Sequence, residues 1–580
     1  MEDNRFFFML MLIFVATLAY FFFTAPPPPP QNASSPPPTP PSSQNPSTEP
    51  GPEKPSTFPS PPSAELKPSV SGLLRNSVME AQWHSKNGDI LSLTLLAKKD
   101  DRYLYPEKGR KDLPLKLLDT AFNSYALRLL DKDGAPVFEG LWECKSRDER
   151  SVEFRAENDS LAVTKRIALS DNGYHFAVRL EFENKTSSEV LFDGLRLIVA
   201  ASVEQERESK GYDYLLIARM RESLEVSEIP LSKADNGKPY KDDGAFHFCG
   251  MSNHYFVFLL LPDDSLTRET VVGALLEKVD SRNTTPEMVL NYSVSAVLGK
   301  IRIAPSGKTP LNFIFFVGPK DPDILDSSEY SLYGFKHVVS YGFFGFLSRL
   351  FLAILKGVHF LVGNWGIAII ILTLIVRGAL YPISRRQQVS MLKYQQKMQV
   401  IQPEMEKLKK KYKDDKQKLN QEILKLMRKH GVSIFPAGGC LLMFLQIPVF
   451  IGLWQALNTS IHLRQASFCL WIDDLSQPDR LFKLGAPIPI LGTPYINLLP
   501  ILMIVAMVIQ SYFQPKTAQA QQQKLMNYFM YIFLSLIFYS LPSGLVLYFL
   551  ASTLVGILES RIIRKQLQAV ADITASKKEV

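Results

Sequence analysis

Cysteine is scarce in this sequence, and the few cysteines present are widely separated. The 580 residues include four cysteines and no CxxC pair. This scarcity excludes a disulfide-rich scaffold, a zinc ribbon and a thioredoxin-like redox site. His247, Cys249 and His254 lie in a strand-like apolar stretch, where core residues are far commoner than metal ligands. We therefore expect no metal site.

The usual signatures of catalysis are also missing. None of the eight histidines precedes a glutamate, so no HExxH zinc-protease helix exists, and no GxSxG motif occurs. The segment 306–309 ends like a phosphate-binding loop, but Arg302 stands where that loop needs glycine. Pro310 also blocks the helix that should follow. We expect no catalytic residues, no nucleotide and no cofactor, and hence a protein that is not an enzyme.

The net positive charge is small for a chain of this length. Lys and Arg number 65 against 57 Asp and Glu, a balance of +8 that does not by itself indicate nucleic acid. The mean hydropathy of zero is an average over long apolar runs and polar segments. The length predicts several structural units rather than one small domain.

The chain begins with an apolar run followed by a proline-rich stretch. Phe6 to Phe23 is long enough to cross a membrane, and the residues after it suit an uncleaved anchor (1–24) better than a cleaved signal peptide. Between Pro26 and Pro68, 18 of 43 residues are proline. Such a segment cannot bury a core, so residues 25–68 should be an extended linker.

The sequence pattern of residues 69–326 predicts a large β-sandwich. Short alternating segments predict half-buried strands, and Asn172-Gly173 predicts a hairpin between 161–169 and 174–183 because both residues accept positive φ. Cys144 and Cys249 both fall in this region. They could form a disulfide in an oxidising compartment, and the sequence leaves this open.

After Tyr330 the chain reads as membrane-spanning. Apolar stretches lie near 351–380, 440–457, 496–512, 525–541 and 545–557, which with the anchor makes six spans. We expect an interfacial amphipathic helix at 327–350, transmembrane helix 2 at 351–381, a basic helical hairpin at 382–436, helices 3–6 at 437–558 and a tail at 559–580.

Basic residues set the orientation. The loop between Pro382 and Gly431 holds fourteen Lys and Arg against five acidic residues, whereas 459–494 is neutral. The positive-inside rule then places the hairpin and both termini in the cytoplasm and the β-domain outside. The hairpin's charge could be a solvated face near anionic phospholipid or a surface that binds ribosome or nascent chain. Its candidate contact residues are Arg385, Arg386, Lys409, Lys410, Lys411, Asp414, Asp415 and Lys416.

Arg377 is a charge inside the second expected span. An intramembrane charge is costly unless water or partners solvate it, which makes it a functional candidate. It could also snorkel, since it lies about 7 Å from the end of the span. Thr373 and Gly366 extend a polar stripe on the same helix. Other spans contribute polar or interfacial residues that could join helices or contact a substrate: Gln446, Trp454, Gln455, Asn497, Gln510, Tyr548 and Ser552.

A set of motifs occurs in order between Tyr333 and Arg564. The motifs are Asn364-Trp365-Gly366, Ile375-Val376-Arg377-Gly378, Tyr381-Pro382, Asp414-Asp415-Lys416-Gln417, Gly438-Gly439-Cys440, Gln446-Ile447-Pro448, Leu463-Arg464-Gln465-Ala466, Leu470-Trp471-Ile472-Asp473-Asp474-Leu475 and Pro542-Ser543-Gly544-Leu545-Val546-Leu547-Tyr548. This set closely resembles the YidC family of bacterial membrane protein insertases. The anchor, linker and outer β-domain also resemble the Gram-negative form.

The resemblance implies a polytopic α-helical membrane protein of six transmembrane helices with a five-helix insertase core and a large periplasmic β-supersandwich. It also implies a hydrophilic groove, open to cytoplasm and lipid, with Arg377 as its positive centre and the polar residues above along it. Relatives often carry a second tyrosine where this chain has Phe549. The partners implied are nascent membrane proteins, the Sec translocon and its accessory subunits, phospholipid, and also ribosome and signal recognition particle receptor.

Two functions of different class follow. The first is an inner-membrane insertase and chaperone that works without ATP, alone or with the Sec translocon. The second is a membrane-anchored periplasmic carbohydrate-binding or carbohydrate-active β-sandwich protein. Five further spans and an ordered basic hairpin exceed what an anchor needs, which favours the first.

Overall fold

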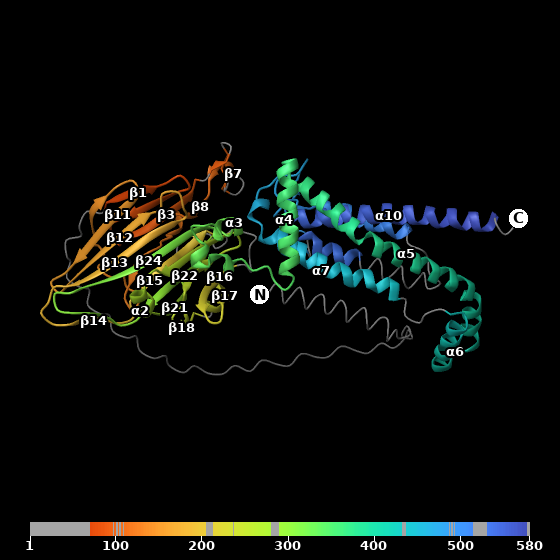
Figure 1. Cartoon of the computed structure of the whole chain (residues 1–580), viewed down its shortest axis with the longest axis horizontal. Helices are drawn as coiled ribbons and strands as arrows, with labels where there is room; N and C mark the ends of the chain where they lie inside the picture. Colours follow the sequence, from red (N-terminus) through yellow and green to blue (C-terminus); the bar gives the residue numbers. More distant parts are fainter. Residues whose placement is uncertain are drawn as a thin grey trace, which may run out of the picture. The chain divides into compact units, whose positions relative to one another are not determined.

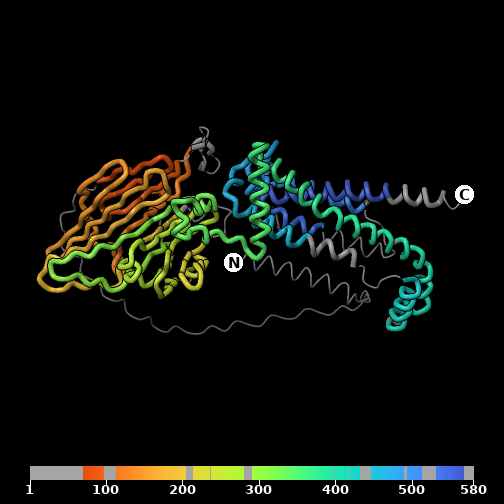
Figure 2. Tube along the Cα trace, in the orientation of Figure 1, coloured from red at the N-terminus to blue at the C-terminus, as the bar shows by residue number. Residues whose placement is uncertain are grey.

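The computed structural model describes two compact units (Figures 1 and 2). Among the described residues, one unit runs from residue 70 to Asn253 and includes Phe258–Val317, and the other consists of His254–Val257 and the chain from Gly318 onward. The described residues run from 70 to 576, except 97, 100–101, 104–105, 108–109, 205–212, 236, 280–288, 414, 432–436, 487, 489–490, 492 and 514–530. The expected anchor (1–24), the linker (25–68) and Asp414 lie outside them.

The first unit is built from antiparallel sheets. A four-stranded sheet has the order β1-β2-β3-β8, a nine-stranded sheet β10-β11-β12-β13-β24-β20-β19-β16-β17, and a five-stranded sheet β18-β21-β22-β15-β9. Paired short strands are β4-β5, β6-β7 and β14-β23. The strands are β1 Ser71–Arg75, β2 Met79–His84, β3 Asp89–Leu95, β4 Lys98–Lys99, β5 Arg102–Tyr103, β6 Pro106–Glu107, β7 Arg110–Pro114, β8 Lys116–Leu118, β9 Leu129–Leu130, β10 Glu143–Arg147, β11 Ser151–Glu157, β12 Leu161–Leu169, β13 His175–Asn184, β14 Val190–Phe192, β15 Arg196–Glu204, β16 Tyr214–Met220, β17 Leu224–Pro230, β18 Tyr240–Asp243, β19 Phe248–Ser252, β20 Phe256–Pro262, β21 Val271–Lys278, β22 Val289–Leu298, β23 Ile301–Ile303 and β24 Lys308–Pro319.

The expected hairpin exists, but its turn differs from the expected one. β12 pairs with β13 from Leu161↔Asn184 to Leu169↔Phe176. Neither Asn172 nor Gly173 has a positive φ. A five-residue loop joins the strands instead, and the Asn76 side chain donates to two carbonyl oxygens of that loop. The hydrogen bonds from Asn76 hold this loop in place, whereas a tight Asn-Gly turn would need a positive φ at both residues.

The open question of a disulfide is answered by the structure. Cys144 in β10 and Cys249 in β19 are both free thiols. Cys249 is fully buried, and this burial raises the pKa of its thiol. It therefore acts as a small apolar core residue.

The second unit is helical. Its longer helices are α4 Gly345–Val362, α5 Trp365–Lys411, α6 Lys416–Lys429, α7 Ala437–Thr459, α8 Leu498–Phe513 and α10 Ser543–Ser576, and its short elements are α3 Pro322–Leu325, η3 Ser331–Tyr333, η4 Phe335–Val338, η5 Ile461–Leu463, β25 Phe482–Lys483 and β26 Tyr495–Ile496. Among the described residues, α4, α5 and α10 are long and apolar enough to cross a membrane, and α8 is a shorter apolar helix. Residues 525–530 of the expected span at 525–541 lie outside the described residues.

The boundary between the expected interfacial helix and second span is different in the structure. Residues 327–344 contain only short 3-10 turns, and the first long helix, α4, continues to Val362. Gly363 then adopts a left-handed φ of 67° and ends it. Asn364 caps the next helix by accepting from Ile367 N at 3.0 Å. The helices thus meet at 363–364, whereas the expected limits 327–350 and 351–381 meet at 350–351.

The backbone also shows no break between the expected second span and the expected hairpin. α5 runs as one helix of 47 residues through Pro382 and Pro403, and α6 folds back along its end (Figure 1). The two amphipathic hairpin helices predicted from the sequence are present. The first of them is the C-terminal half of α5.

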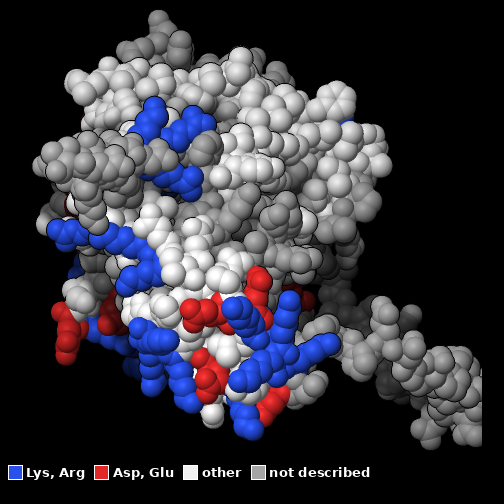
Figure 3. Space-filling model, turned by 90° about the vertical axis from the view of Figure 1, so that its right-hand side faces the viewer, with Lys and Arg blue, Asp and Glu red and all other residues white. Residues whose placement is uncertain are grey.

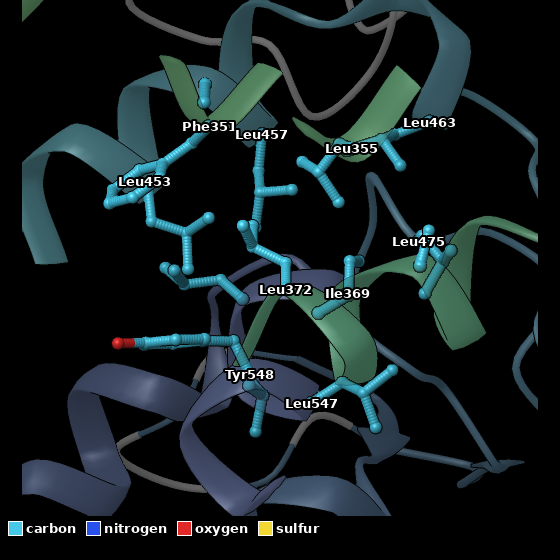
Figure 4. Close-up of a cluster of buried hydrophobic side chains, with 14 of the residues drawn as sticks. Phe351, Leu355, Ile369, Leu372, Leu453, Leu457, Leu463, Leu475, Leu547 and Tyr548 are labelled. Atoms are coloured by element: carbon cyan, nitrogen blue, oxygen red, sulfur yellow. The ribbon is translucent and has the colours of Figure 1, made fainter. Parts of the chain in front are cut away.

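One apolar core joins the membrane helices (Figure 4). α4 contributes Phe351 and Leu355, and α5 contributes Ile369 and Leu372. Leucines of α7 and the face of α10 around Tyr548 complete it, so the helices that carry the polar residues are held by apolar packing.

Candidate functional site

Two polar stripes face each other between α5 and α10. On α5, Arg377 and Ser384 are seven residues apart, which places them on one face of the helix. On α10, Tyr548, Ser552 and Glu559 recur at intervals of four and seven residues. Each stripe is a single face because these intervals are close to whole helical turns.

Arg377 is held against α10 rather than extended toward the helix end. Its Nε donates to Ser552 Oγ at 2.8 Å, and its guanidinium nitrogen lies 3.8 Å from a carboxylate oxygen of Glu559. The Arg377 side chain is 17% exposed and that of Glu559 is 9% exposed. Gly556 of α10 lies beside the guanidinium, where a Cβ would make an ordinary van der Waals contact at 3.7 Å.

Glu559 is the residue that the sequence analysis missed. Ser384 Oγ lies 3.4 Å from its carboxylate, and Gln388 Nε2 donates to Ser384 Oγ at 3.3 Å. We had assigned residue 559 to the cytoplasmic tail, although α10 continues past it without a break. The signal was available in the spacing, because Glu559 follows Ser552 by seven residues.

Two predicted glutamines approach these residues from other helices. Gln446 of α7 donates to the Tyr548 hydroxyl at 3.1 Å. Gln510 of α8 approaches Gly556, where a Cβ would be 3.2 Å from its Nε2. We call the set Arg377, Ser384, Gln510, Tyr548, Ser552 and Glu559 the arginine cluster.

Aromatic packing accounts for two further positions near Tyr548. Trp454 packs edge-on against Phe450, with the ring centroids 5.6 Å apart. Phe549, where relatives often carry tyrosine, packs against Phe450 and Phe538 at 5.1 and 4.5 Å. Its ring therefore fills a place in an aromatic group that requires no hydroxyl.

The structure does not bring Gly366, Thr373 or Asn497 into the arginine cluster. A Cβ at Gly366 would lie 2.1 Å from the Phe468 ring, so this glycine permits close packing of a loop. Thr373 is fully buried and donates to the Ile369 carbonyl of its own helix at 2.7 Å. Asn497 is buried and donates to the Tyr539 carbonyl at 2.6 Å. These three residues support helix ends and packing.

The basic hairpin has its own apolar seam. Met398, Ile401 and Met405 of α5 pack against Leu426 and Met427 of α6. This seam fixes the hairpin and leaves the other faces of both helices to solvent.

The charged hairpin residues lie outside that seam. Asp415 caps α6 by accepting from Lys418 N at 3.0 Å, so its role is structural. The main chain of Lys416 begins α6. Figure 3 shows Lys and Arg side chains gathered on this side of the molecule. The exposed predicted contacts are Arg385, Arg386, Lys409, Lys410 and Lys411.

One group of described residues has the composition of a metal site. Asp321, Asp323 and His462 place potential ligand atoms within 4.8 Å of one another. The Lys356 ammonium already lies 2.6 Å from the Asp323 carboxylate, and His462 Nε2 lies 3.3 Å from Asp321. Lys356 forms ion pairs with both carboxylates, and these contacts together with His462 join α3, α4 and η5.

Two family models match the chain. Residues 74–354 match the YidC periplasmic domain, and residues 357–570 match the 60Kd inner membrane protein. The insertase YidC of Pelobacter propionicus is 30% identical over 85% of this chain and 86% of its own length. This chain belongs to the YidC family of membrane protein insertases. As a YidC family member it is an inner-membrane protein with a large β-rich periplasmic domain.

Other YidC relatives match shorter parts. The Geobacter sulfurreducens protein is 31% identical over 70% of this chain and 69% of its own length. The Pseudoalteromonas atlantica protein is 34% identical over 54% of this chain and 51% of its own length. A crystal structure of active YidC insertase covers 84% of this chain at 20% identity with a TM-score of 0.35, too low to support an argument. The YidC relatives do not favour the carbohydrate alternative.

Proposed function

We propose that this YidC family member inserts nascent membrane proteins through a hydrophilic groove centred on Arg377. The observation that carries the proposal is the arginine cluster, where a guanidinium in a span-length helix binds a hydroxyl and faces a carboxylate. A charge among apolar helices costs at least about 2 to 3 kcal/mol unless it is solvated or paired. Polar groups from several helices at this point would lower the cost for a polar segment of a substrate.

The free energy for insertion would come from the substrate. Transfer of its apolar segment into lipid is favourable without ATP, and Arg377 would attract acidic residues in the segment that must cross. Apolar side chains beside Arg377, Leu374 and Ile375, are about half exposed. They offer the apolar segment a surface beside the charged group.

The proposal includes the finer topology. We propose six spans, from the apolar stretches of the sequence, with a five-helix core as the resemblance to the family implies. The fourteen basic against five acidic residues between 382 and 431 favour both termini in the cytoplasm. The protein would act as a chaperone and insertase rather than as an enzyme.

The hairpin is proposed to receive the incoming chain at the cytoplasmic surface. Its exposed basic residues would attract anionic phospholipid, and also ribosome or signal recognition particle receptor. Cooperation with the Sec translocon and its accessory subunits belongs to the same proposal. A hairpin with its own apolar seam keeps its basic face in place without support from the partner.

Replacement of Arg377 by Gln tests the proposal. We expect insertion of a two-span substrate with aspartates in its outer segment to fall about tenfold, the effect of losing about 1.4 kcal/mol of attraction. A substrate with asparagines instead should be little affected. Protease protection in sealed vesicles measures both.

The matched control is Arg349→Gln, which removes an arginine of α4 that lies outside the arginine cluster. It should leave insertion of both substrates unchanged. Equal insertion of the acidic substrate by the Arg377→Gln variant and the unchanged protein would refute the electrostatic role.

A further inference from the structure

Arg377 is not a bare cation in this structure. Its guanidinium lies 3.8 Å from the Glu559 carboxylate, and both side chains are largely shielded from solvent. Charges this close in a poorly hydrated site attract one another by several times more than in water. Arg377 therefore already has a counter-charge before any substrate arrives.

The pair is weaker than an optimal one, and its geometry suits exchange. The Arg377–Glu559 distance exceeds that of a direct hydrogen bond, whereas the Nε bond to Ser552 has good length. Ser384 Oγ lies 3.4 Å from the same carboxylate and can support Glu559 if Arg377 turns away. The terminal nitrogens of the guanidinium lie beside Gly556, next to the Gln510 side chain.

We infer that Glu559 is an internal competitor for Arg377 and sets how long the acidic side chain of a substrate is held. This inference rests on the proposed function, because it requires an acidic substrate group at Arg377. Binding would be an exchange in which the substrate carboxylate takes the place of Glu559. The return of Glu559 would release the substrate and restore the neutral pair.

The exchange explains why the site can act repeatedly. An unpaired arginine in a poorly hydrated site would hold a substrate carboxylate strongly, because separating them would leave a costly lone charge. With Glu559 present, the separation leaves an ion pair instead. A substrate carboxylate must compete with Glu559 for Arg377. Substrates with more acidic residues in the crossing segment should therefore bind better than substrates with fewer.

The test measures the half-life of the complex between the full-length protein in liposomes and a two-span substrate. The substrate carries a photocrosslinker beside a single aspartate or, in a matched version, a single asparagine. With Glu559→Gln we expect the aspartate complex to live about tenfold longer, a change of about 1.4 kcal/mol, because changes at buried charged contacts act mainly on the dissociation rate. The asparagine complex should keep its half-life.

Two further variants sharpen this result. Glu559→Asp keeps the charge on a shorter side chain, so it should prolong the aspartate complex less than Glu559→Gln does. Asp473→Asn removes an exposed acidic charge from the loop after η5 and should change neither half-life. In the Arg377→Gln background, Glu559→Gln should have no effect.

The outcomes separate this inference from the proposed function. If Arg377→Gln impairs insertion of the acidic substrate while Glu559→Gln and Glu559→Asp leave the half-life unchanged, the competitor role is wrong and the proposed function stands. If Glu559→Gln lengthens both complexes equally, the effect is not a competition between carboxylates and the inference fails. If Arg377→Gln changes nothing, both fail.

Discussion

The least expected residue of the β-rich unit is Lys165, a lysine with no exposed surface. Its Nζ donates to the carbonyls of Gly88 and Leu127, each at 2.6 Å, and lies 5.1 Å from the centre of the Trp142 ring. Burial lowers the pKa of Lys165 to about 7, against the opposing effect of Asp89. The Lys165 side chain therefore joins two loops to β12, and it loses its proton more easily than an exposed lysine does.

Lys165 makes the stability of the β-rich unit depend on pH. Its pKa is lower in the folded than in the unfolded state, so between about pH 7 and 10 the unfolded chain binds more protons and stability rises with pH. The slope is at most about 1.4 kcal/mol per pH unit. Lys165→Met should remove this slope, measured by pulse proteolysis of the full chain in urea.

The control for Lys165 is Lys238→Met, which changes an exposed lysine of the same unit. It should keep the slope of the unchanged protein. A Lys165→Met variant with the same pH dependence as the unchanged protein would contradict the assignment.

At the residue scale, sequence reasoning finds unusual residues but not their partners. Arg377 was evident as a charge in an apolar run, and Ser552 and Tyr548 as polar residues in another. That Arg377 faces Glu559 depends on how α5 and α10 pack, which no local pattern contains. Thr373 is the converse case, a polar residue of the expected span whose hydroxyl donates within its own helix in the structure.

At the element scale, the junction of α4 and α5 falls inside the largely apolar stretch 351–380 that predicts a single span. Gly363 and Asn364 together are a helix stop followed by a helix cap, and hydropathy alone does not register them. Asn364 also donates to the Phe468 carbonyl at 3.1 Å. The strands and the hairpin seam were easier to predict, because their apolar residues recur at regular intervals.

Two glycines of α5 provide a matched test of this junction. Gly366→Ala should destabilise the helical unit by about 1 to 3 kcal/mol, because its Cβ would overlap the Phe468 ring. Gly378→Ala meets nothing within 4 Å and should be neutral or slightly stabilising. Thermal unfolding of the purified protein in detergent measures both. Equal unfolding temperatures for the two variants would show that Phe468 does not pack on Gly366.

At the scale of the whole molecule, the two units divide the residues of the chain into a β-rich part and a helical part with the arginine cluster. Deletion of residues 70–317, with α3 and all later elements kept, should preserve insertion because every cluster residue remains. Viability after depletion of the chromosomal copy and vesicle insertion measure this. If the helices of the deletion variant still fold but insertion is lost, the β-rich unit is required for the function and the prediction is wrong.

The central claim is that this chain inserts proteins by itself through the arginine cluster. The most direct test places the purified protein in sealed liposomes without ATP and asks whether a short two-span substrate becomes protected from protease. We predict protection that requires the protein and falls when Arg377 is replaced by Gln. Absence of protection, with the protein folded in the liposomes, would contradict autonomous insertion, and protection unaffected by Arg377→Gln would contradict the cluster's role.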